Sequence, residues 1–293
     1  MSQPSFIDKF SQQFSLEPSR TALLVIDMQN ATGNRNMGLG KLLAEQGQSK
    51  SAQYRFDRID NLLIPNIQRL ITGFREAGAH VIWITYGANA ADASDAPHHI
   101  APIIKATNNI AGQPEHEVVD ALKPGPGDLV LNKTTQGAFR STALDSSLRA
   151  LGVDTVVSTG VSTNNCVAMT SMEACDLQYR VVVTSDATGT DSEEMQEATL
   201  TMLKRLWSRV LTTDEVLSEL TAGGSRTCPA SRTPVSSAGC WWPLGPSSWP
   251  PRDCSPNTST TWASASTTWR PSARCWPCRA SHYWLGCIEA KPK

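Results

Sequence analysis

The sequence predicts an α/β protein in which six strands form a mainly parallel sheet between two layers of helices, a three-layer α/β/α arrangement. Short apolar runs rich in β-branched residues alternate along the chain with segments whose apolar residues recur at helical spacing. A continuous apolar run is typical of a strand covered on both faces, and regular alternation with helices is typical of parallel βαβ units. The pattern extends over roughly 200 residues, which is enough chain to bury one large core.

Each expected strand is a short apolar run bounded by polar residues, Gly or Pro. The first, T-A-L-L-V-I, lies between Pro18 and Asp27, and the fourth begins at Val153 and ends at Gly160. The second and fifth read H-V-I-W-I-T-Y and R-V-V-V-T, and β-branched residues of this kind favour strands. The six expected strands are residues 21–26, 80–86, 128–132, 153–160, 180–184 and 209–212.

The segments between these strands contain the expected helices. In residues 58–77 the apolar side chains follow helical spacing, Pro65 marks a kink or the true start, and Gly78 is a suitable C-terminal cap. Residues 33–55 and 87–104 are polar and are predicted as loops, the first with a short helix at 41–46. The expected helices are residues 58–77, 114–122, 141–151, 164–175, 191–207 and 214–220.

Composition excludes several classes of protein. The 26 Lys and Arg residues nearly balance the 27 Asp and Glu residues, so nothing global indicates binding to nucleic acid or to an anionic membrane surface. No apolar run approaches the roughly 18 residues of a membrane span, and residues 1–20 lack the apolar core of a signal peptide. A cytoplasmic enzyme acting on a small molecule is therefore the expected class.

The composition changes sharply near residue 221. Six of the 8 Cys and seven of the 9 Trp lie beyond that point, where Asp253 and Glu289 are the acidic residues and Leu, Ile and Val are nearly absent. Such a segment cannot build an ordinary core. Cys275 and Cys278 form one C-x-x-C, and the lack of a second pair at zinc-ribbon spacing disfavours a metal site there. The expected organisation is an N-terminal arm (1–20), one α/β domain (21–220) and an irregular tail (221–293).

Two explanations of the tail stay open at this point. The odd composition favours GC-rich DNA read in a shifted frame after the domain has ended, which reading the gene in its other frames would test. The alternative is a surface rich in Trp and Arg that binds a partner.

Three chemically useful side chains follow expected strands. Asp27, Lys133 and Cys166 each stand at or just beyond a carboxyl end, and the carboxyl ends of parallel strands share one edge of a sheet. A Cys nucleophile needs a base and a neighbour that stabilises thiolate, roles that Asp27 and Lys133 can fill. A helix N-terminus at Cys166 would also lower the pKa of its thiol. Taken alone, Cys166 could equally be a small apolar core residue.

At this point the sequence resembles the isochorismatase-like cysteine hydrolases, the superfamily of nicotinamidase, N-carbamoylsarcosine amidase, biuret hydrolase and ureidoacrylate amidohydrolase. The resemblance covers about residues 20–220. The matching motifs are L-L-V-I-D-M-Q-N (23–30), V-L-N-K-T-T-Q-G-A-F (130–139), S-T-A-L-D-S-S-L-R-A-L-G-V (141–153) and T-G-V-S-T-N-N-C-V-A-M-T (159–170). Together they are specific for the superfamily and weak on substrate.

The resemblance implies a catalytic triad of Asp27, Lys133 and Cys166. It also implies a cis peptide bond between Val161 and Ser162 and an oxyanion hole formed by the backbone N–H groups of Ser162 and Cys166. It further implies a homo-oligomer. Residues near strand ends or the Cys166 turn are candidates for contact with substrate, although packing or exposed loop positions would explain them as well. These candidates are Asn30, Tyr86, Gln136, Phe139 and Asn164.

One departure from the family concerns metal. Nicotinamidases carry Asp-x-His after the second strand, where this chain reads Tyr86-Gly87-Ala88-Asn89. His98 and His99 lie further along, and adjacent His residues on a loop are more often exposed than ligating. We therefore expect no catalytic metal and no cofactor, and nicotinamide is disfavoured as substrate.

The expected activity is cleavage of a C–N bond in a small amide, carbamoyl or ureido compound by a cysteine-dependent hydrolase, through a thioester. An isochorismate-type hydrolase of a vinyl ether is the first alternative. A non-catalytic interaction protein that works through its Trp-rich tail is the alternative of another class, and intact Asp27, Lys133 and Cys166 argue against it.

Overall fold

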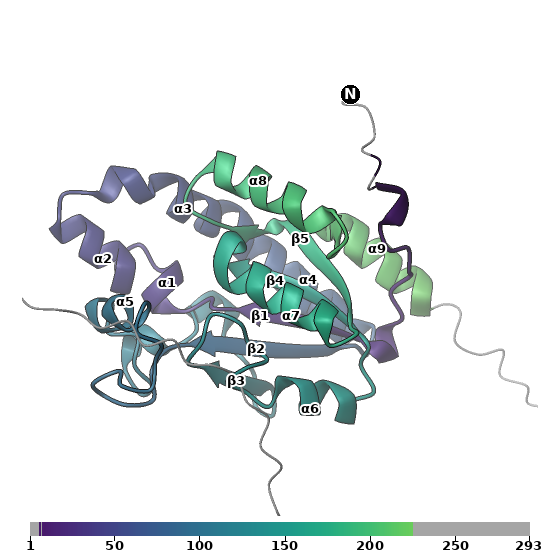
Figure 1. The fold of residues 1–293 in the computed structure, drawn as a ribbon, viewed down its shortest axis with the longest axis horizontal. Helices are drawn as coiled ribbons and strands as arrows, with labels where there is room; N and C mark the ends of the chain where they lie inside the picture. The colour runs from purple at the N-terminus through teal and green to yellow at the C-terminus, as the bar shows by residue number, and fades with distance from the viewer. Residues whose placement is uncertain (1–5, 7, 225–293) are drawn as a thin grey trace, which may run out of the picture. The chain divides into compact units, whose positions relative to one another are not determined.

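The sheet is built from six strands, all of which pair in parallel within the residues described by this computed structural model, which are residue 6 and residues 8–224. Its strand order is β3-β2-β1-β4-β5-β6 (Figure 1). The strands are β1 (Thr21–Ile26), β2 (His80–Tyr86), β3 (Leu129–Lys133), β4 (Thr155–Val161), β5 (Arg180–Gly189) and β6 (Arg209–Leu211). The predicted three-layer α/β/α architecture is thus confirmed, with a sheet that is wholly rather than mainly parallel.

The helices cover the sheet on two faces. Described α-helical segments are α1 (Asn30–Gly33), α2 (Gly38–Glu45), α3 (Gln53–Arg58), α4 (Ile64–Glu76), α5 (Ala101–Ala106), α6 (Leu144–Ala150), α7 (Ala168–Asp176), α8 (Glu193–Lys204) and α9 (Thr213–Gly224). One core lies between the sheet and α3, α4 and α9, and contains Leu23, Val25, Phe74 and Val216. The other lies against α6, α7 and α8. Neighbouring residues of β1 therefore enter opposite cores, as the pleat requires.

The segment between β1 and β2 is more helical than the sequence indicated. The predicted loop 33–55 contains α2, a 3₁₀ turn at Ser49–Ala52 and the start of α3. A Cβ on Gly38 would lie 2.4 Å from Cα of Ala31, and one on Gly40 would lie 2.3 Å from the carbonyl oxygen of Arg35. These glycines therefore allow close packing of backbone within a segment that was predicted as a loop.

Pro65 does not start the helix that contains it. The helix begins at Gln53, passes through a π-helical turn at Ile59–Leu63 and continues as α4, with Pro65 in the first turn of α4. A π-helical turn relaxes the backbone hydrogen-bond ladder just where proline has no N–H to donate. The expected start at residue 58 was therefore five residues late.

Other boundaries differ by a few residues. Residues 114–122 form two 3₁₀ turns, Pro114–His116 and Asp120–Leu122, where one helix was expected, and α5 occupies part of the predicted loop 87–104. β5 runs to Gly189 because the ladder with β4 shifts register between Ser158 and Gly160 and then continues to Gly189. Gly160 lies inside β4 and does not end it.

The ends of the chain are only partly described. Two 3₁₀ turns, Asp8–Phe10 and Pro18–Arg20, lie in the predicted arm, and α9 continues four residues into the predicted tail. The prediction for residues 225–293 lies outside the described residues. Among the helices that are described, none is both long and apolar enough to cross a membrane.

Gly160 is required at the point where β4 passes β1. Its φ is +104°, and a Cβ there would lie 1.9 Å from the carbonyl oxygen of Ile26. We expect Gly160→Ala to destabilise the fold by well over the roughly 1–3 kcal/mol of backbone strain alone, because the clash also pushes β1 away from β4. Chemical denaturation of the purified variant measures the effect.

Gly152→Ala is the matched control for this substitution. Gly152 also has a positive φ, +71°, but its Cβ would meet nothing within 4 Å. The Gly152→Ala substitution should lower the free energy of unfolding by only about 1 kcal/mol, from backbone strain. Equal losses in the two variants would contradict the steric argument.

Candidate active site

Three predicted side chains meet at the carboxyl edge of the central strands. Ile26, at the end of β1, pairs with Ile84 in β2 and with Gly160 in β4, and Tyr86 pairs with Lys133 at the end of β3. Four neighbouring strands therefore end within two residues of one another. Parallel sheets place their ligand sites at this edge.

Asp27 is aimed into this edge by an unusual backbone conformation. Its φ is +53°, a left-handed value that Asp adopts more readily than most residues. Its N–H donates to the carbonyl of Ile84 at 2.8 Å, and its own carbonyl accepts the hydroxyl of Thr32. Asp27 as a whole residue is 1% exposed, so its carboxylate lies almost wholly out of water.

Lys133 reaches Asp27 across an intervening strand. Its Nζ donates to Asp27 Oδ2 at 2.9 Å and to the carbonyl of Thr135 at 3.2 Å. Because β2 lies between β3 and β1, the ammonium passes over the ring of Tyr86, 4.4 Å from the ring centroid. Lys133 is fully buried, so the ion pair stands in a low-dielectric environment.

Cys166 comes from the segment after β4. The peptide bond between Val161 and Ser162 is cis, at the position named from the sequence. A π-helical turn, Thr163–Val167, follows and leads into α7. The first hydrogen bond of the π-helical turn runs from the N–H of Val167 to the carbonyl of Ser162. The N–H of Cys166 therefore lies in the first turn of the helix, where backbone donors lack partners within the helix.

Burial dominates the electrostatics of the thiol. Burial, and then the carboxylate of Asp27, raise the pKa of Cys166 to about 12, against the lowering effect of Lys133. The expectation of a pKa lowered by the helix N-terminus was therefore wrong, because burial of the thiol at 8% exposure and the nearby carboxylate outweigh it. At neutral pH Cys166 is a thiol that must transfer its proton before it can attack.

Asp27 is suited to accept that proton. Burial raises the pKa of Asp27 above its ordinary value, while Lys133, the thiol of Cys166 and Arg55 lower it and offset part of the rise. Burial also lowers the pKa of Lys133, but the neighbouring carboxylate of Asp27, together with Cys166, outweighs burial and raises it overall. The ammonium is thus held charged. Asp27 Oδ1 is buried and has no hydrogen-bond partner of normal geometry within the described residues.

The five predicted substrate contacts fall into different settings. The ring of Tyr86 faces Lys133, as described, and Asn164 Oδ1 accepts the hydroxyl of Thr190 at 2.6 Å. Asn30 donates to the carbonyl of Pro114 at 3.0 Å. The ring of Phe139 is partly buried and packs 5.7 Å from that of Tyr179, against the core beneath α6 and α7. Gln136 is half-buried on the loop after β3.

Sequence reasoning missed two buried polar residues near the triad. Gln29 is wholly buried, accepts the N–H of Tyr86 at 2.7 Å and donates to the carbonyls of Tyr86 and His116. It thereby fixes the loop after Asp27 to the end of β2. Its place in the motif around Asp27 was the available signal. The other is Arg55, whose side chain contacts Ser162 and Thr32; it lies in a segment predicted as a loop.

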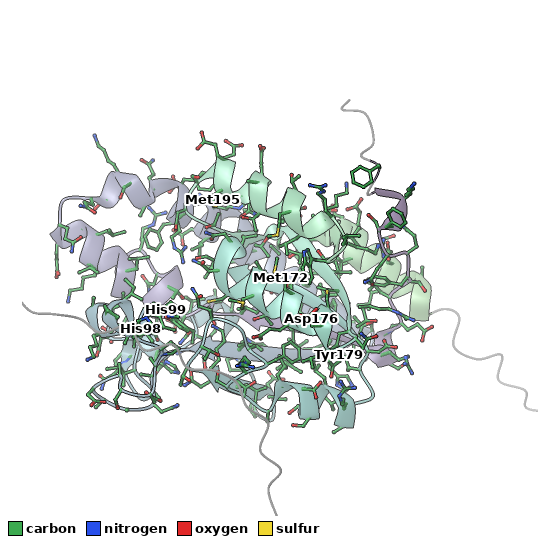
Figure 2. All side chains as sticks on the ribbon, in the orientation of Figure 1. His98, His99, Met172, Asp176, Tyr179 and Met195 are labelled. Atoms are coloured by element: carbon green, nitrogen blue, oxygen red, sulfur yellow. The ribbon has the colours of Figure 1, made fainter. Side chains whose placement is uncertain are left out.

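The described residues offer no cluster of three or more His, Cys, Asp or Glu side chains that could hold a metal ion. His98 and His99 lie side by side on the loop before α5, with ring centroids 5.6 Å apart, and both are exposed (Figure 2).

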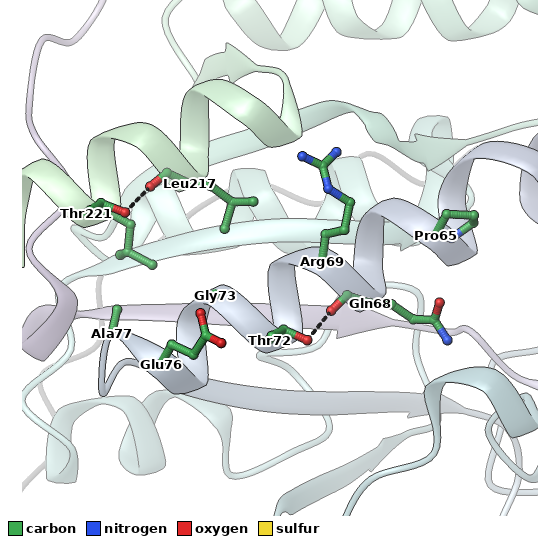
Figure 3. Close-up of a pocket in the computed structure, with 10 residues that line it drawn as sticks. Pro65, Gln68, Arg69, Thr72, Gly73, Glu76, Ala77, Leu217 and Thr221 are labelled. Atoms are coloured by element: carbon green, nitrogen blue, oxygen red, sulfur yellow. Dashed lines mark hydrogen bonds between the residues drawn. The ribbon is translucent and has the colours of Figure 1, made fainter.

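A groove between α4 and α9 lies apart from this chemistry (Figure 3). It is lined by residues such as Gly73 and Leu217, and no triad residue contributes to it. The hydroxyls of Thr72 and Thr221 donate to carbonyls of their own helices, and Arg69 pairs with Asp214. These polar groups are thus occupied within the fold, and none of them is aimed at a shared point in the groove.

Comparison with known proteins places these observations in a family. The family described as the isochorismatase domain matches residues 21–215. The chain is 32% identical over 199 residues to ureidoacrylate amidohydrolase RutB of Variovorax paradoxus, and the match covers 63% of this chain and 75% of that relative.

Solved structures agree with the sequence match. A cysteine hydrolase from Pseudomonas syringae pv. phaseolicola has a TM-score of 0.60 at 25% identity, covering 76% of this chain and 100% of that one. N-carbamoylsarcosine amidase from Thermoplasma acidophilum has a TM-score of 0.51 at 27% identity, covering 67% and 97%. Both similarities are to proteins named as hydrolases or amidases.

Proposed function

This chain belongs to the isochorismatase family of hydrolases, and on that premise we propose that it cleaves a C–N bond of a small amide, carbamoyl or ureido compound through a cysteine thioester. The carbamoyl and ureido classes come from the relatives named for ureidoacrylate and N-carbamoylsarcosine. The proposal includes no metal, no cofactor and no nucleic-acid or membrane partner.

The proposal depends on a difference between the two carboxylate oxygens of Asp27. Oδ2 is held by Lys133 at 2.9 Å, whereas buried Oδ1 has no conventional hydrogen-bond partner in the described part of the chain. The thiol of Cys166 lies near enough to both groups to raise the pKa of Lys133 and to lower that of Asp27. General-base activation of a nucleophile needs a carboxylate that is held in place beside the thiol and has one oxygen free to accept a proton.

The proposed reaction begins with proton transfer from Cys166 to Asp27 as sulfur attacks the substrate carbonyl. The backbone N–H groups of Ser162 and Cys166 would stabilise the oxyanion, each by about 3 kcal/mol in comparable sites. The tetrahedral intermediate then collapses to a thioester, and the C–N bond breaks as Asp27 returns the proton to the departing amine or ammonia. Water, deprotonated by Asp27, attacks the thioester and releases the acid and the thiol.

Lys133 supports both half-reactions without taking or giving a proton. Its positive charge stabilises the carboxylate of Asp27 in the resting enzyme and the thiolate as the proton leaves Cys166. Tyr86 forms the wall over which the ammonium lies, and we propose that Tyr86, Asn30, Asn164 and Gln136 border the substrate.

A screen for ammonia release tests the proposed function. The panel holds small amides, carbamoyl compounds and ureides, each assayed with the wild-type protein and with Cys166→Ala. Release by the wild-type protein alone is the expected result. Isochorismate belongs in the same panel, because hydrolysis of its vinyl ether without ammonia release would favour the alternative. Ammonia release that survives in Cys166→Ala would overturn the thioester mechanism.

The pH dependence of kcat/KM should report the raised pKa of Asp27. Protonated Asp27 cannot accept the thiol proton, so activity falls as the pH drops through the pKa of Asp27. Because that pKa lies above the ordinary 3.8, the acid limb should lie above pH 3.8. At the alkaline end, the raised pKa of Lys133 keeps the ammonium charged beyond pH 10.5. A profile of kcat/KM against pH that stays flat down to pH 3.8 would contradict this assignment.

We also propose that the protein is a homo-oligomer. Along α7 and α8 the side chains of Met169, Met195 and Met202 are each more than a third exposed, and self-association would cover apolar groups of this kind. Light scattering on the full chain should give a multiple of 31.7 kDa.

We also propose a cytoplasmic location. Two free cysteines in the described domain, Cys166 and Cys175, support it. Cell fractionation tests that location.

A further inference from the structure

Arg55 is a buried arginine whose hydrogen bonds join three separate segments. Its residue is 5% exposed. Nη1 donates to Ser162 Oγ at 2.8 Å and to Asp191 Oδ1 at 3.0 Å. Nη2 and Nε donate to the carbonyl of Thr32 at 2.9 Å and 3.3 Å. The planar guanidinium therefore spans the gap between α1 and the turn after β4.

Both ends of this bridge lead to the reacting groups. The hydroxyl of Thr32 donates to the carbonyl of Asp27, so Arg55 holds the loop that carries the base. Ser162 carries one of the two backbone N–H groups of the proposed oxyanion hole, and its carbonyl accepts the N–H of Val167, next to the nucleophile. A displacement of about 1 Å between groups so placed can cost about 100-fold in rate.

Burial of Arg55 is hard to explain by stability alone. Its ion-pair partner Asp191 has a side chain that is 67% exposed, so the counter-charge stands largely in water. A buried charge is costly unless it is well paired, and an exposed partner compensates it weakly. The fork of donors is instead occupied by a carbonyl and a hydroxyl beside the triad, which fits the geometry that only arginine offers.

We propose that Arg55 is a positioning residue, which fixes the segment of Asp27 relative to the oxyanion turn of Ser162 so that base, nucleophile and oxyanion donors stay aligned. The inference rests on the proposed hydrolase function. It assigns Arg55 a role in kcat, without contact with the substrate.

The charge of Arg55 gives a second, independent readout. Arg55 lowers the pKa of Asp27, whose other charged or titratable neighbours are Lys133, Cys166 and the phenol of Tyr86. Loss of that charge alone should therefore raise the pKa of Asp27 further. A purely structural role would not move the acid limb of the pH profile.

The test compares Arg55→Met, Arg55→Lys, Ser162→Ala and the double variant Arg55→Met/Ser162→Ala. Arg55→Met should lower kcat by about 100-fold, change KM little and move the acid limb of kcat/KM upward. Arg55→Lys should lose kcat but keep the acid limb, because it keeps the charge without the fork. The double variant should be no slower than Arg55→Met, since both changes break the same contact.

Controls separate this inference from its premise. Asp191→Asn removes the exposed counter-charge and should keep kcat near the wild-type value. If Cys166→Ala stays active, the proposed function fails whatever Arg55 does. If Cys166→Ala is inactive and Arg55→Met has wild-type kcat and acid limb, the role of Arg55 alone is overturned. Should Arg55→Met not fold, wild-type kcat in Arg55→Lys would overturn it equally, and a loss of kcat with an unmoved acid limb would support it.

Discussion

Cys166→Ala should lower kcat/KM for the ammonia-releasing substrate by about 10⁴-fold or more, without unfolding the protein. Removal of a nucleophile that acts in a unit with its base abolishes nearly all of the contribution of that unit. Cys166 is buried with the apolar residues beneath α6 and α7, so loss of one sulfur should cost only about 1–2 kcal/mol of stability. The measurement is steady-state kinetics on the substrate found in the screen, with denaturation in urea beside it.

Cys175→Ala is the matched control for this variant. Cys175 lies in α7, nine residues after Cys166. Its thiol donates to the carbonyl of Trp207 at 2.7 Å and does not belong to the proposed triad. Burial raises the pKa of its thiol to about 11. Both thiols are therefore protonated at neutral pH, and only Cys166 has a base beside it.

Iodoacetamide labelling gives the same contrast without a substrate. Cys166 should react faster than Cys175 at neutral pH, because Asp27 can take its proton. Peptide mapping is needed, since six further cysteines follow residue 224. Equal, slow labelling of the two cysteines, or turnover by Cys166→Ala, would rule out Cys166 as the nucleophile.

The convergence of Asp27, Lys133 and Cys166 was predictable because it depends on strand ends, which apolar runs reveal. T-A-L-L-V-I fixes where β1 stops, and Asp27 follows it; the same reasoning places Lys133 on β3. The end of β4 was less certain, because Gly160 resembled a terminator. In the fold it is a strand residue that keeps a Cβ away from Ile26, and such a contact between distant segments leaves no local pattern.

The surroundings of the triad were not predictable in the same way. Arg55 belongs to a polar stretch that reads like a surface loop, and a buried arginine differs from an exposed one only in tertiary contacts. The prediction of a lowered pKa for Cys166 failed for a related reason. A helix N-terminus is visible in sequence, whereas burial and the distance to Asp27 are not, and these two causes outweighed it.

Lys133→Met should lose both activity and stability, because it leaves the carboxylate of Asp27 buried and unpaired. Removing one partner of a buried ion pair typically costs about 3–5 kcal/mol. Without the ammonium, the pKa of Asp27 rises further, so the carboxyl is a poorer acceptor of the thiol proton at a given pH, and kcat/KM should fall by about 10³-fold. Urea denaturation and steady-state kinetics measure the two losses. Arg35→Met, which breaks an exposed pair with Asp57 and Asp60, should cost at most about 1 kcal/mol.

The double variant Asp27→Asn/Lys133→Met separates the two roles of the pair. Replacing both charges by neutral residues of similar volume leaves no buried carboxylate, so most of the stability lost in Lys133→Met should return. Activity should not return, because Asn cannot accept the thiol proton. That pair of results would mean that the reaction requires the ion pair and that stability alone does not. A double variant as unstable as Lys133→Met would contradict the electrostatic explanation, and one that hydrolyses substrate would remove Asp27 as the base.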